Sequence, residues 1–390
     1  MLLGLRIEKH VPGFVDGYFG PPELKALVQA EAAPRAVLAL LNDVQSLQAS
    51  LARSSYDEQR RKYLTRQLTG IRTVLRRLAG EAIPFADEVL GCFDVLPDRT
   101  DEAVYERALN RLKSVLPGQG PVRERMIAWR RSFDLPKERL LAPVDLTLNE
   151  LRKRTAAILP LPDGESLSVE LVTAKPWSGY NWYLGNYRSR VEINTDLPVK
   201  AHALPALIAH EGYPGHHTEH AVKEALLWRA GGRMEHSILL INTPECLISE
   251  GIASLALECV LPESERAAWL RDVFFPATGL TGLNAEQVIA VNRATRDLAS
   301  VPGNAAFMLH ADGRDQREVA EYLQHYGLLT PEEADKRLSF LTDPLWRSYI
   351  FTYFHGERLL RAWLDRVGWK DGFRRLVSEP IYPSQLAEVT

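Results

Sequence analysis

The chain contains few cysteines and no run of about 18 apolar residues, the length that a membrane-spanning helix requires. Its three cysteines, Cys92, Cys246 and Cys259, cannot all pair within one chain, and their wide separation argues against a cysteine-based zinc site. The segment after Met1 has a short apolar patch that soon turns charged, without a signal-peptide core. These absences predict buried thiols in a reducing compartment, and hence a cytoplasmic protein.

A large charge of either sign is also missing. The net charge is −3, so the sequence predicts neither nucleic acid nor an anionic membrane as a partner. Hydrophobic residues make up 46% of the chain and charged residues 25%, which is typical of a soluble globular protein. The 390 residues suffice for one large domain or two joined ones. We expect a helical region over 1–160, packed as one unit with a second region over 161–390.

Helical periodicity dominates the chain from about residue 22 to residue 159. Leu, Ala, Arg, Glu and Gln are abundant there, and apolar residues recur at spacings of three and four. Breaks at Pro84, Pro97 and Pro117 separate the predicted helices. A helix is also expected to begin at Pro244. Later helices are predicted over 285–300, 304–309, 315–326, 331–341, 345–367 and 372–377.

Strand-like sequence is confined to one short region. Residues 166–172 alternate with period two, and 180–187 and 190–194 are rich in aromatic and β-branched residues. This pattern predicts a small antiparallel sheet of two or three strands. An edge strand of such a sheet can bind an extended peptide. The predicted fold class is therefore mainly α, a large helical protein with a small antiparallel β-sheet beside an active-site cleft.

The most informative motif follows the predicted sheet. An apolar helical run from Leu204 brings His210 and Glu211 side by side, and His216 and His217 follow a Gly-Tyr-Pro-Gly interruption. Imidazoles together with a carboxylate at the end of a helix are the ingredients of a metal site that activates water. The motif therefore predicts metal-dependent hydrolysis.

The spacing of the histidines leaves the second metal ligand open. His210 and His216 are six residues apart, so on an undisturbed helix, at roughly 100° per residue, they would diverge, whereas His217 would return to the same face. Pro214, however, has no N–H to donate to the carbonyl of His210, and its ring presses on that carbonyl. The helix must therefore bulge or break, and both His216 and His217 remain candidates.

A third ligand is expected from the apolar helix that begins at Pro244. Its candidates, Glu250 and Glu258, are eight residues apart, or roughly 12 Å along a helix, so both cannot bind one ion. Small residues, beginning with Gly251, follow Glu250 and allow a partner helix to pack closely, which favours Glu250 as the ligand. Glu258 is then a candidate for orienting a ligand imidazole from behind.

Groups that bind the substrate are expected on the helix over 345–367. Tyr353 is the candidate donor to an oxyanion, because Gly356, close to one turn further on, permits close approach to the cleft. Other candidates for substrate binding are Tyr349, His355, Arg358, Arg188 and Arg190, with His310 and Asp312 as a weaker possibility.

Three motifs together resemble the DUF885 family of bacterial proteins. Residues 210–217 resemble its His-Glu-x-x-Pro-Gly-His motif, 250–258 its Glu-Gly-Trp-Ala-x-Tyr-x-Glu motif and 353–356 its Tyr-x-x-Gly segment. Ile252 and Leu255 depart from the aromatic residues of the second motif, which bears on the shape of the substrate pocket.

The family is regarded as a group of predicted zinc metallopeptidases similar to gluzincins. The resemblance thus implies His210, His216 and Glu250 as ligands of one Zn²⁺ ion and Glu211 as the base, beside a gluzincin-like cleft. Two histidines and a carboxylate also suit other divalent transition metals.

The function expected from the sequence is zinc-dependent hydrolysis of short peptides by a metal-activated water. A peptide or a small amide is the expected partner. Two alternatives stay open: a metal-dependent hydrolase of non-peptide amides or esters, and a non-catalytic helical binding protein with a vestigial metal site.

Overall fold

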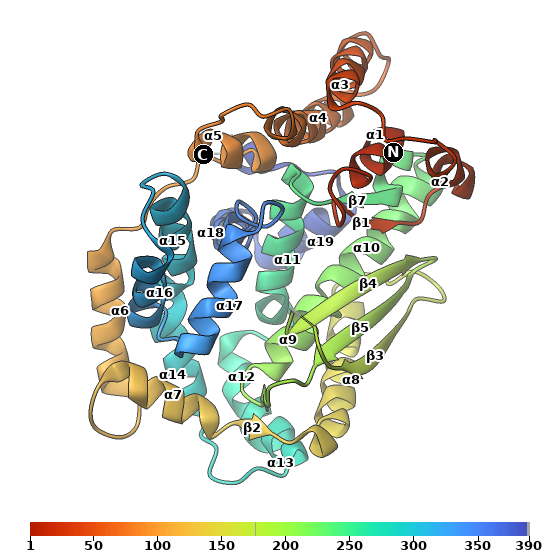
Figure 1. Ribbon diagram of the computed structural model, residues 1–390. Helices are drawn as coiled ribbons and strands as arrows, with labels where there is room; N and C mark the ends of the chain where they lie inside the picture. Colours follow the sequence, from red (N-terminus) through yellow and green to blue (C-terminus); the bar gives the residue numbers. More distant parts are fainter. Residues whose placement is uncertain (176, 388–390) are drawn as a thin grey trace.

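The computed structural model describes residues 1–175 and 177–387, and these form a mainly α-helical protein (Figure 1). The helices before the main sheet are α1 (Leu2–Glu8), α2 (Pro22–Gln29), α3 (Val37–Ala52), α4 (Glu58–Leu78), α5 (Phe85–Phe93), α6 (Glu102–Val115), α7 (Val122–Arg131) and α8 (Leu141–Ala156). Those after it are α9 (Leu204–Glu211), α10 (His216–Lys223), α11 (Pro244–Val260), α12 (Glu263–Trp269), α13 (Phe275–Thr278), α14 (Ala285–Thr295), α15 (Val301–His310), α16 (Gln316–Tyr326), α17 (Pro331–Thr342), α18 (Ile350–Val367), α19 (Trp369–Ser378) and α20 (Pro383–Ala387). The predicted mainly α fold class is confirmed.

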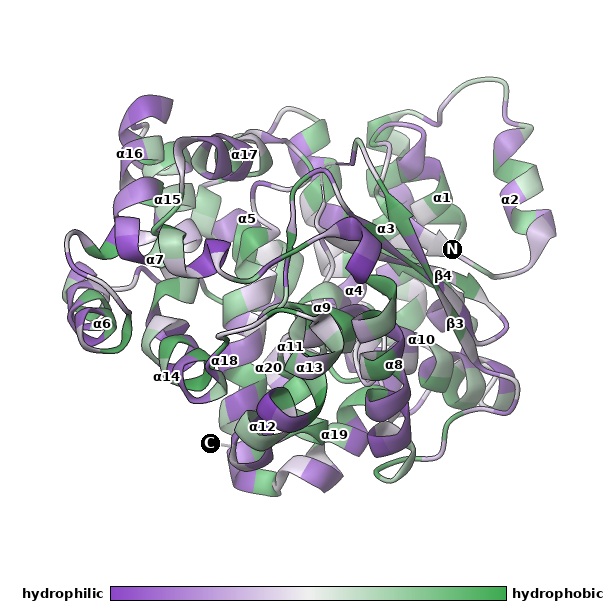
Figure 2. Cartoon of the chain, turned by 90° about the horizontal axis from the view of Figure 1, so that it is seen from below, coloured by the Kyte–Doolittle hydropathy of each residue, from purple (hydrophilic) through white to green (hydrophobic). Residues whose placement is uncertain are grey.

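Local sequence signals set several helix boundaries. The side chain of Asp57 caps α4 by accepting a hydrogen bond of 2.8 Å from the backbone N–H of Arg60. Thr330 and Glu333 form a reciprocal capping box at the start of α17. Pro84 directly precedes α5, as the predicted break requires. Figure 2 shows hydrophilic residues over much of the peripheral helices α2 and α16, as expected for helices with one solvated face.

The main sheet is mixed rather than antiparallel. Its strands are β3 (Ser166–Val172), β4 (Gly179–Gly185) and β5 (Arg188–Asn194), in the order β3-β5-β4. β4 and β5 form an antiparallel hairpin, but β3 and β5 run parallel, so the antiparallel prediction was wrong for that pair. The physical reason is that β5, and not β4, is the central strand. β5 carries Val191 and Ile193, which are at most 1% exposed, as suits the central position. β3 therefore pairs with β5 and not with β4, and these two strands run in the same direction.

Two small sheets join segments that are distant in the sequence. β1 (Val15–Tyr18) pairs antiparallel with β7 (Ile238–Leu240), and β2 (Asp134–Leu135) pairs with β6 (Val199–Lys200). The first of these pairings fixes the N-terminal segment to the strand that precedes α11.

Close contact between α11 and α18 lies at the centre of the molecule. A Cβ on Gly356 would lie 2.5 Å from the carbonyl oxygen of Leu247 and 3.0 Å from the backbone nitrogen of Gly251. The two glycines therefore let the helix backbones touch. The largest hydrophobic core extends from Leu3 to Phe354 and includes residues from both halves of the chain. Among the described residues, none of the helices combines the length and the apolar character needed to cross a bilayer.

Candidate metal centre

The histidine motif is divided between two helices. α9 ends at Glu211 and α10 begins at His216, with the Gly-Tyr-Pro-Gly segment folded back between them. The backbone N–H of Gly215 donates to the carbonyl of Ala209 at 2.9 Å, and a Cβ on Gly215 would lie 2.0 Å from the carbonyl oxygen of His210. This agrees with the break expected from Pro214.

The break brings three metal-ligating side chains together. His210, His216 and Glu250 each offer one ligand atom, and these atoms lie within 4.8 Å of one another. Nε2 of His210 lies 3.4 Å from Oε2 of Glu250, and Nε2 of His216 lies 3.9 Å from Oε1. The two imidazoles remain 22% and 14% exposed, so the cluster is accessible from solvent. Oε2 of Glu250 is buried and accepts no hydrogen bond from the residues that the structure describes.

His217, the alternative candidate, belongs to a different network. Its side chain is fully buried, with Nε2 2.9 Å from the carboxylate of Glu165 and Nδ1 2.8 Å from the hydroxyl of Ser189. Tyr213 and Arg152 bind the same carboxylate. His217 therefore ties the Gly-Tyr-Pro-Gly segment to the sheet and α8, and His216 is the one that joins the cluster.

A hydrogen-bonded chain behind His216 sets its orientation. The hydroxyl of Ser249 donates to Glu219 at 2.5 Å, and so its oxygen is free to accept from Nδ1 of His216 at 3.1 Å. Glu219 in turn pairs with the buried Lys223 at 2.6 Å. This arrangement leaves the lone pair of Nε2 facing Glu250. Burial lowers the pKa of His216 to about 3, so the imidazole is in the neutral, metal-binding form at pH 7.

The sequence analysis did not identify these hydrogen-bonding partners of His216. Glu219 follows His216 by one helical turn, and Ser249 directly precedes Glu250. A polar residue adjacent to a candidate ligand on an apolar helix is the signal that could have identified Ser249.

Tyr349 contacts the carboxylate of Glu250. It is 6% exposed, and its hydroxyl donates to Oε1 of Glu250 at 2.7 Å. The hydroxyl therefore fixes the carboxylate, and a contact of Tyr349 with the substrate stays a prediction. Tyr353 lies one turn further along α18, with its ring 5.7 Å from that of Tyr349. Burial and the nearby charge of Glu250 raise the pKa of Tyr353 well above the usual value, which keeps its phenol protonated.

Glu211 lies between the cluster and β4. Burial raises its pKa to about 7; Glu250 and Asp16 act in the same direction and His210 opposes them. The side-chain amide of Asn181 donates to the backbone carbonyl of Glu211 at 2.5 Å. A Cβ on Gly179 would lie 3.5 Å from Cγ of Glu211. The first half of β4 therefore packs against the end of α9.

Asp16 is a further acidic group near the cluster that sequence reasoning missed. It lies on β1, and the hydroxyl of Tyr180 on β4 donates to it. Burial raises its pKa to about 6, and the charge of Glu250 adds to this effect. Its proximity depends on the pairing of β1 with β7, which no local sequence pattern reveals.

Three predicted site residues on the central helices point away from the cluster. Glu258 is bound by Arg361, with two contacts of 2.9 and 2.8 Å, and does not reach a histidine. His355 and Arg358 contact each other at 2.8 Å, and both face Asp98. They lie about 200° and 140° around α18 from Tyr353, so the structure does not bring these two residues to the cluster.

The remaining candidates do not belong to the cluster. Arg188 is exposed on β5, and Arg190 faces Glu192 at 3.3 Å. His310 bonds the backbone carbonyl of Leu341, and Asp312 pairs with Arg99. Both side chains therefore contact other parts of the fold and not the cluster.

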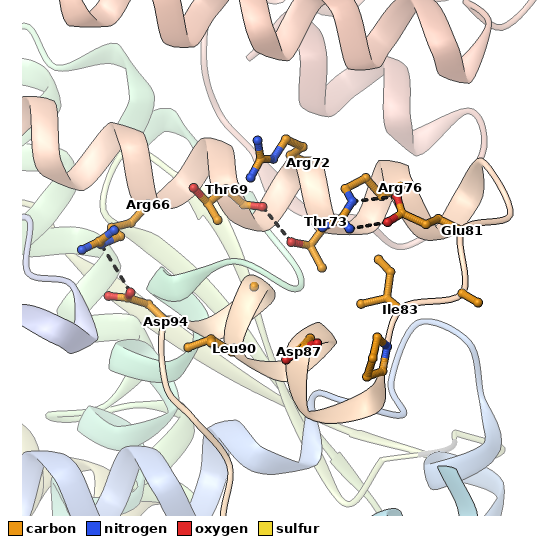
Figure 3. A pocket seen from close by; sticks show the side chains of 13 residues that line it. Arg66, Thr69, Arg72, Thr73, Arg76, Glu81, Ile83, Asp87, Leu90 and Asp94 are labelled. Atoms are coloured by element: carbon orange, nitrogen blue, oxygen red, sulfur yellow. Dashed lines mark hydrogen bonds and ion pairs between the residues drawn. The ribbon is translucent and has the colours of Figure 1, made fainter. Parts of the chain in front are cut away.

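A separate cavity of about 490 Å³ lies between α4 and α5 (Figure 3). Arg66 pairs there with Asp94 at 3.3 Å, and Arg76 pairs with Glu81. The cavity is lined by none of the cluster residues, so it is not part of the candidate centre.

Comparison with known proteins gives the fold but no function. No protein-family model matches the chain, and no curated protein matches it. A "putative lipoprotein" from Colwellia psychrerythraea has a similar crystal structure, with 13% identity and a TM-score of 0.54 over 89% of this chain and 65% of that one. A "putative lipoprotein of unknown function" from Shewanella oneidensis has 12% identity and a TM-score of 0.50 over 94% and 76%. This chain thus spans about 65% of the length of the Colwellia protein, and the likeness concerns the fold alone.

Proposed function

We propose that this protein is a zinc-dependent hydrolase, and specifically a metallopeptidase that acts on short peptides. The observation that carries the proposal is the convergence of His210, His216 and Glu250, with Glu211 adjacent to the first of them. The resemblance to the DUF885 family is part of the same proposal.

The donor set fits a catalytic zinc ion. Two imidazole nitrogens and one carboxylate oxygen are three protein ligands, which is the number that leaves a position open for water. A buried carboxylate oxygen without a hydrogen bond is costly, and a cation would satisfy Oε2 of Glu250. A zinc ion held there would supply Lewis-acid catalysis and acidify water.

The surrounding residues suit the remaining steps. With a pKa of about 7, Glu211 can accept a proton from the attacking water and pass it to the leaving amine. The protonated phenol of Tyr353 can donate to the oxyanion. Tyr349 and Ser249 hold Glu250 and His216 in position. β4 is an edge strand of its sheet and packs against the end of α9, so an extended peptide could bind along it.

Metal analysis and a substrate panel test the proposal. Protein purified without added metal should contain about one equivalent of zinc. It should hydrolyse peptides from a panel that also contains esters and non-peptide amides. The variant E211Q should keep its metal and lose about 1,000-fold in turnover, because only the base is removed. The matched control E258Q, on α11 but outside the cluster, should retain both.

Two results would count against the proposal. Less than about a tenth of an equivalent of metal, with no affinity on titration, would exclude the metal site. Turnover of esters or non-peptide amides without turnover of any peptide would leave the metal site standing and replace the substrate class.

A further inference from the structure

Three aromatic side chains gather around the start of β4. The ring of Tyr180 lies 4.9 Å from that of Trp177 and 4.7 Å from that of Trp182. All three side chains are partly exposed. Tryptophan and tyrosine offer a large apolar surface together with a polar atom, which is why they are common where proteins bind ligands. We refer to Trp177, Tyr180 and Trp182 as the aromatic group.

Contacts of the same strand place the aromatic group beside the candidate centre. Asn181, which lies between Tyr180 and Trp182, donates to the backbone carbonyl of Glu211 at 2.5 Å. A Cβ on Gly179 would lie 3.5 Å from Cγ of Glu211, and Figure 1 shows the start of β4 beside α9. At about 3.3 Å per residue, Trp182 is about 10 Å along the strand from Gly179. A short peptide bound at the cluster can therefore reach the aromatic group.

Two hydrogen-bond donors of the aromatic group are unused. The indole N–H groups of Trp177 and Trp182 are buried and donate to no acceptor among the residues that the structure describes. By contrast, the indole N–H of Trp129 donates to Gln287 at 3.1 Å. A buried indole N–H usually has an acceptor. The two unused donors are therefore available to the carbonyl oxygens of a bound peptide.

The segment that carries Trp177 is held by the sheet. The side-chain amide of Asn194, at the end of β5, donates to the backbone carbonyls of Lys175 and Trp177 at 2.8 and 2.9 Å. The backbone N–H of Asn194 donates to the carbonyl of Ser178 at 2.9 Å. The aromatic group is thus positioned before any ligand binds, which lowers the entropic cost of binding.

We propose that the aromatic group binds a side chain of the substrate, so that this protein prefers peptides with an aromatic or large apolar residue within about three residues of the cleaved bond. The inference rests on the proposed peptidase function and adds a substrate class to it. Tyr180 and Trp182 share one face of β4, whereas Asn181 faces α9. A peptide added to the edge of β4 alternates in the same way, so every second side chain would pack on the rings.

A positional scan of one phenylalanine tests the inference by turnover. The phenylalanine is moved one residue at a time through a peptide of alanine and serine. The wild type should show a maximum at one or two positions, with kcat/KM about 100-fold above that of the peptide without phenylalanine, because an apolar site discriminates side chains of different size to about this degree. W182A should lose the maximum. W369A, which removes a partly exposed tryptophan whose indole N–H donates to Asp365, should keep it.

A binding measurement separates this inference from the proposed function. In calorimetry, zinc-loaded E211Q should bind the best phenylalanine peptide about 100-fold more tightly than the peptide without phenylalanine. E211Q/W182A should bind the two peptides about equally. That result supports the role of the aromatic group even if the wild type hydrolyses no peptide. Equal binding of the two peptides by E211Q, binding of neither, or a preference retained in E211Q/W182A would overturn the inference.

The variant W182F covers the case in which W182A does not fold. It keeps an aromatic ring at this position and removes only the indole N–H. E211Q/W182F should bind the phenylalanine peptide about fivefold more weakly than E211Q, because one hydrogen bond to the peptide is lost. If W182A does not fold, equal affinity of E211Q and E211Q/W182F for this peptide would overturn the inference, because the rings would then serve the fold alone.

Discussion

Adjacent residues on a helix point about 100° apart, and His216 and His217 use that difference. His216 turns toward Glu250, while His217 turns toward Glu165 and Ser189 on a different side of α10. The two side chains therefore have separable consequences. One belongs to the candidate centre, and the other belongs to a buried network that supports the fold.

Paired alanine variants should separate these two roles. H216A should weaken zinc affinity by about 100-fold or more and change the stability of the metal-free protein little, because it removes a ligand. H217A should keep zinc affinity within a few-fold and lower the free energy of unfolding by about 3 kcal/mol, because Glu165 loses a buried partner. Zinc titration and urea unfolding of the metal-free proteins provide the measurements. The opposite pattern, with zinc binding lost in H217A alone, would show that His217 and not His216 is the metal ligand.

A further prediction at the residue scale concerns the hydroxyl of Ser249. S249A removes the acceptor for Nδ1 of His216 and leaves Glu219 with Lys223 as a partner. Zinc affinity should fall by about 10- to 100-fold, as for other groups that orient ligand imidazoles. S254A, at an exposed position of the same helix, is the matched control and should bind zinc as the wild type does. Identical affinities in S249A and the wild type would show that the chain behind His216 does not orient it.

At the scale of secondary structure elements, periodicity predicted most helices but not their partners. The helices from α3 to α8 follow the apolar spacing, and α11 begins at Pro244 as expected. α18 begins at Ile350, later than predicted, because turns occupy the preceding residues. The parallel pairing of β3 with β5 depends on which strand becomes central. The pairing of β1 with β7 joins segments more than 200 residues apart, and local patterns carry no information about it.

The same limit applies to the candidate site. His210, Glu211 and Glu250 were predicted because each lies in a motif with a chemical reason for its spacing. Asp16 lies on β1, an element that only the tertiary fold brings near the cluster. His355 and Arg358 were expected from the same helix as Tyr353, but both face Asp98 on another side of α18.

The contact between α11 and α18 gives a prediction for a single methyl group. G356A would place a Cβ 2.5 Å from the carbonyl of Leu247, so the helices must separate. We expect a loss of about 2 kcal/mol in stability, as for other overpacked cores. Zinc affinity should fall as well, because Tyr349, directly before α18, holds Glu250 on α11. Thermal unfolding and zinc titration would check both effects. Wild-type values for both would show that the helices adjust without moving the centre.

At the scale of the whole molecule, the N-terminal region supports the candidate centre from behind. Tyr63 on α4 donates to Glu245, in the first turn of α11, at 2.7 Å. Glu245 also faces Lys223 at 3.4 Å. A continuous buried polar network therefore extends from α4 through α10 to Ser249 and His216. This network links the N-terminal helices to the residues that orient His216.

Several histidines with lowered pKa values should make the whole molecule sensitive to acid. His202 is an example away from the cluster: its ring lies 4.8 Å from that of Trp129 and 4.6 Å from that of Phe133, and burial lowers its pKa to about 4. Arg130 and Lys200 act in the same direction. The unfolded chain, with a histidine pKa of about 6.5, binds the proton first as the pH falls. Above pH 6.5 His202 therefore does not lower the free energy of unfolding. As the pH falls from 6.5 to about 4, its protonation in the unfolded chain lowers that free energy progressively.

The variant H202Q should reduce this acid sensitivity, since glutamine does not titrate. In urea unfolding of the metal-free protein, the wild type should lose about 2 kcal/mol more than H202Q between pH 7.5 and pH 5, by linkage to this one group. H325Q, at an exposed position on α16, is the matched control and should follow the wild type. Equal losses in the wild type and H202Q would mean that His202 becomes protonated without unfolding. Its aromatic pocket would then tolerate the charge, as cation–π contacts with Trp129 and Phe133 would allow.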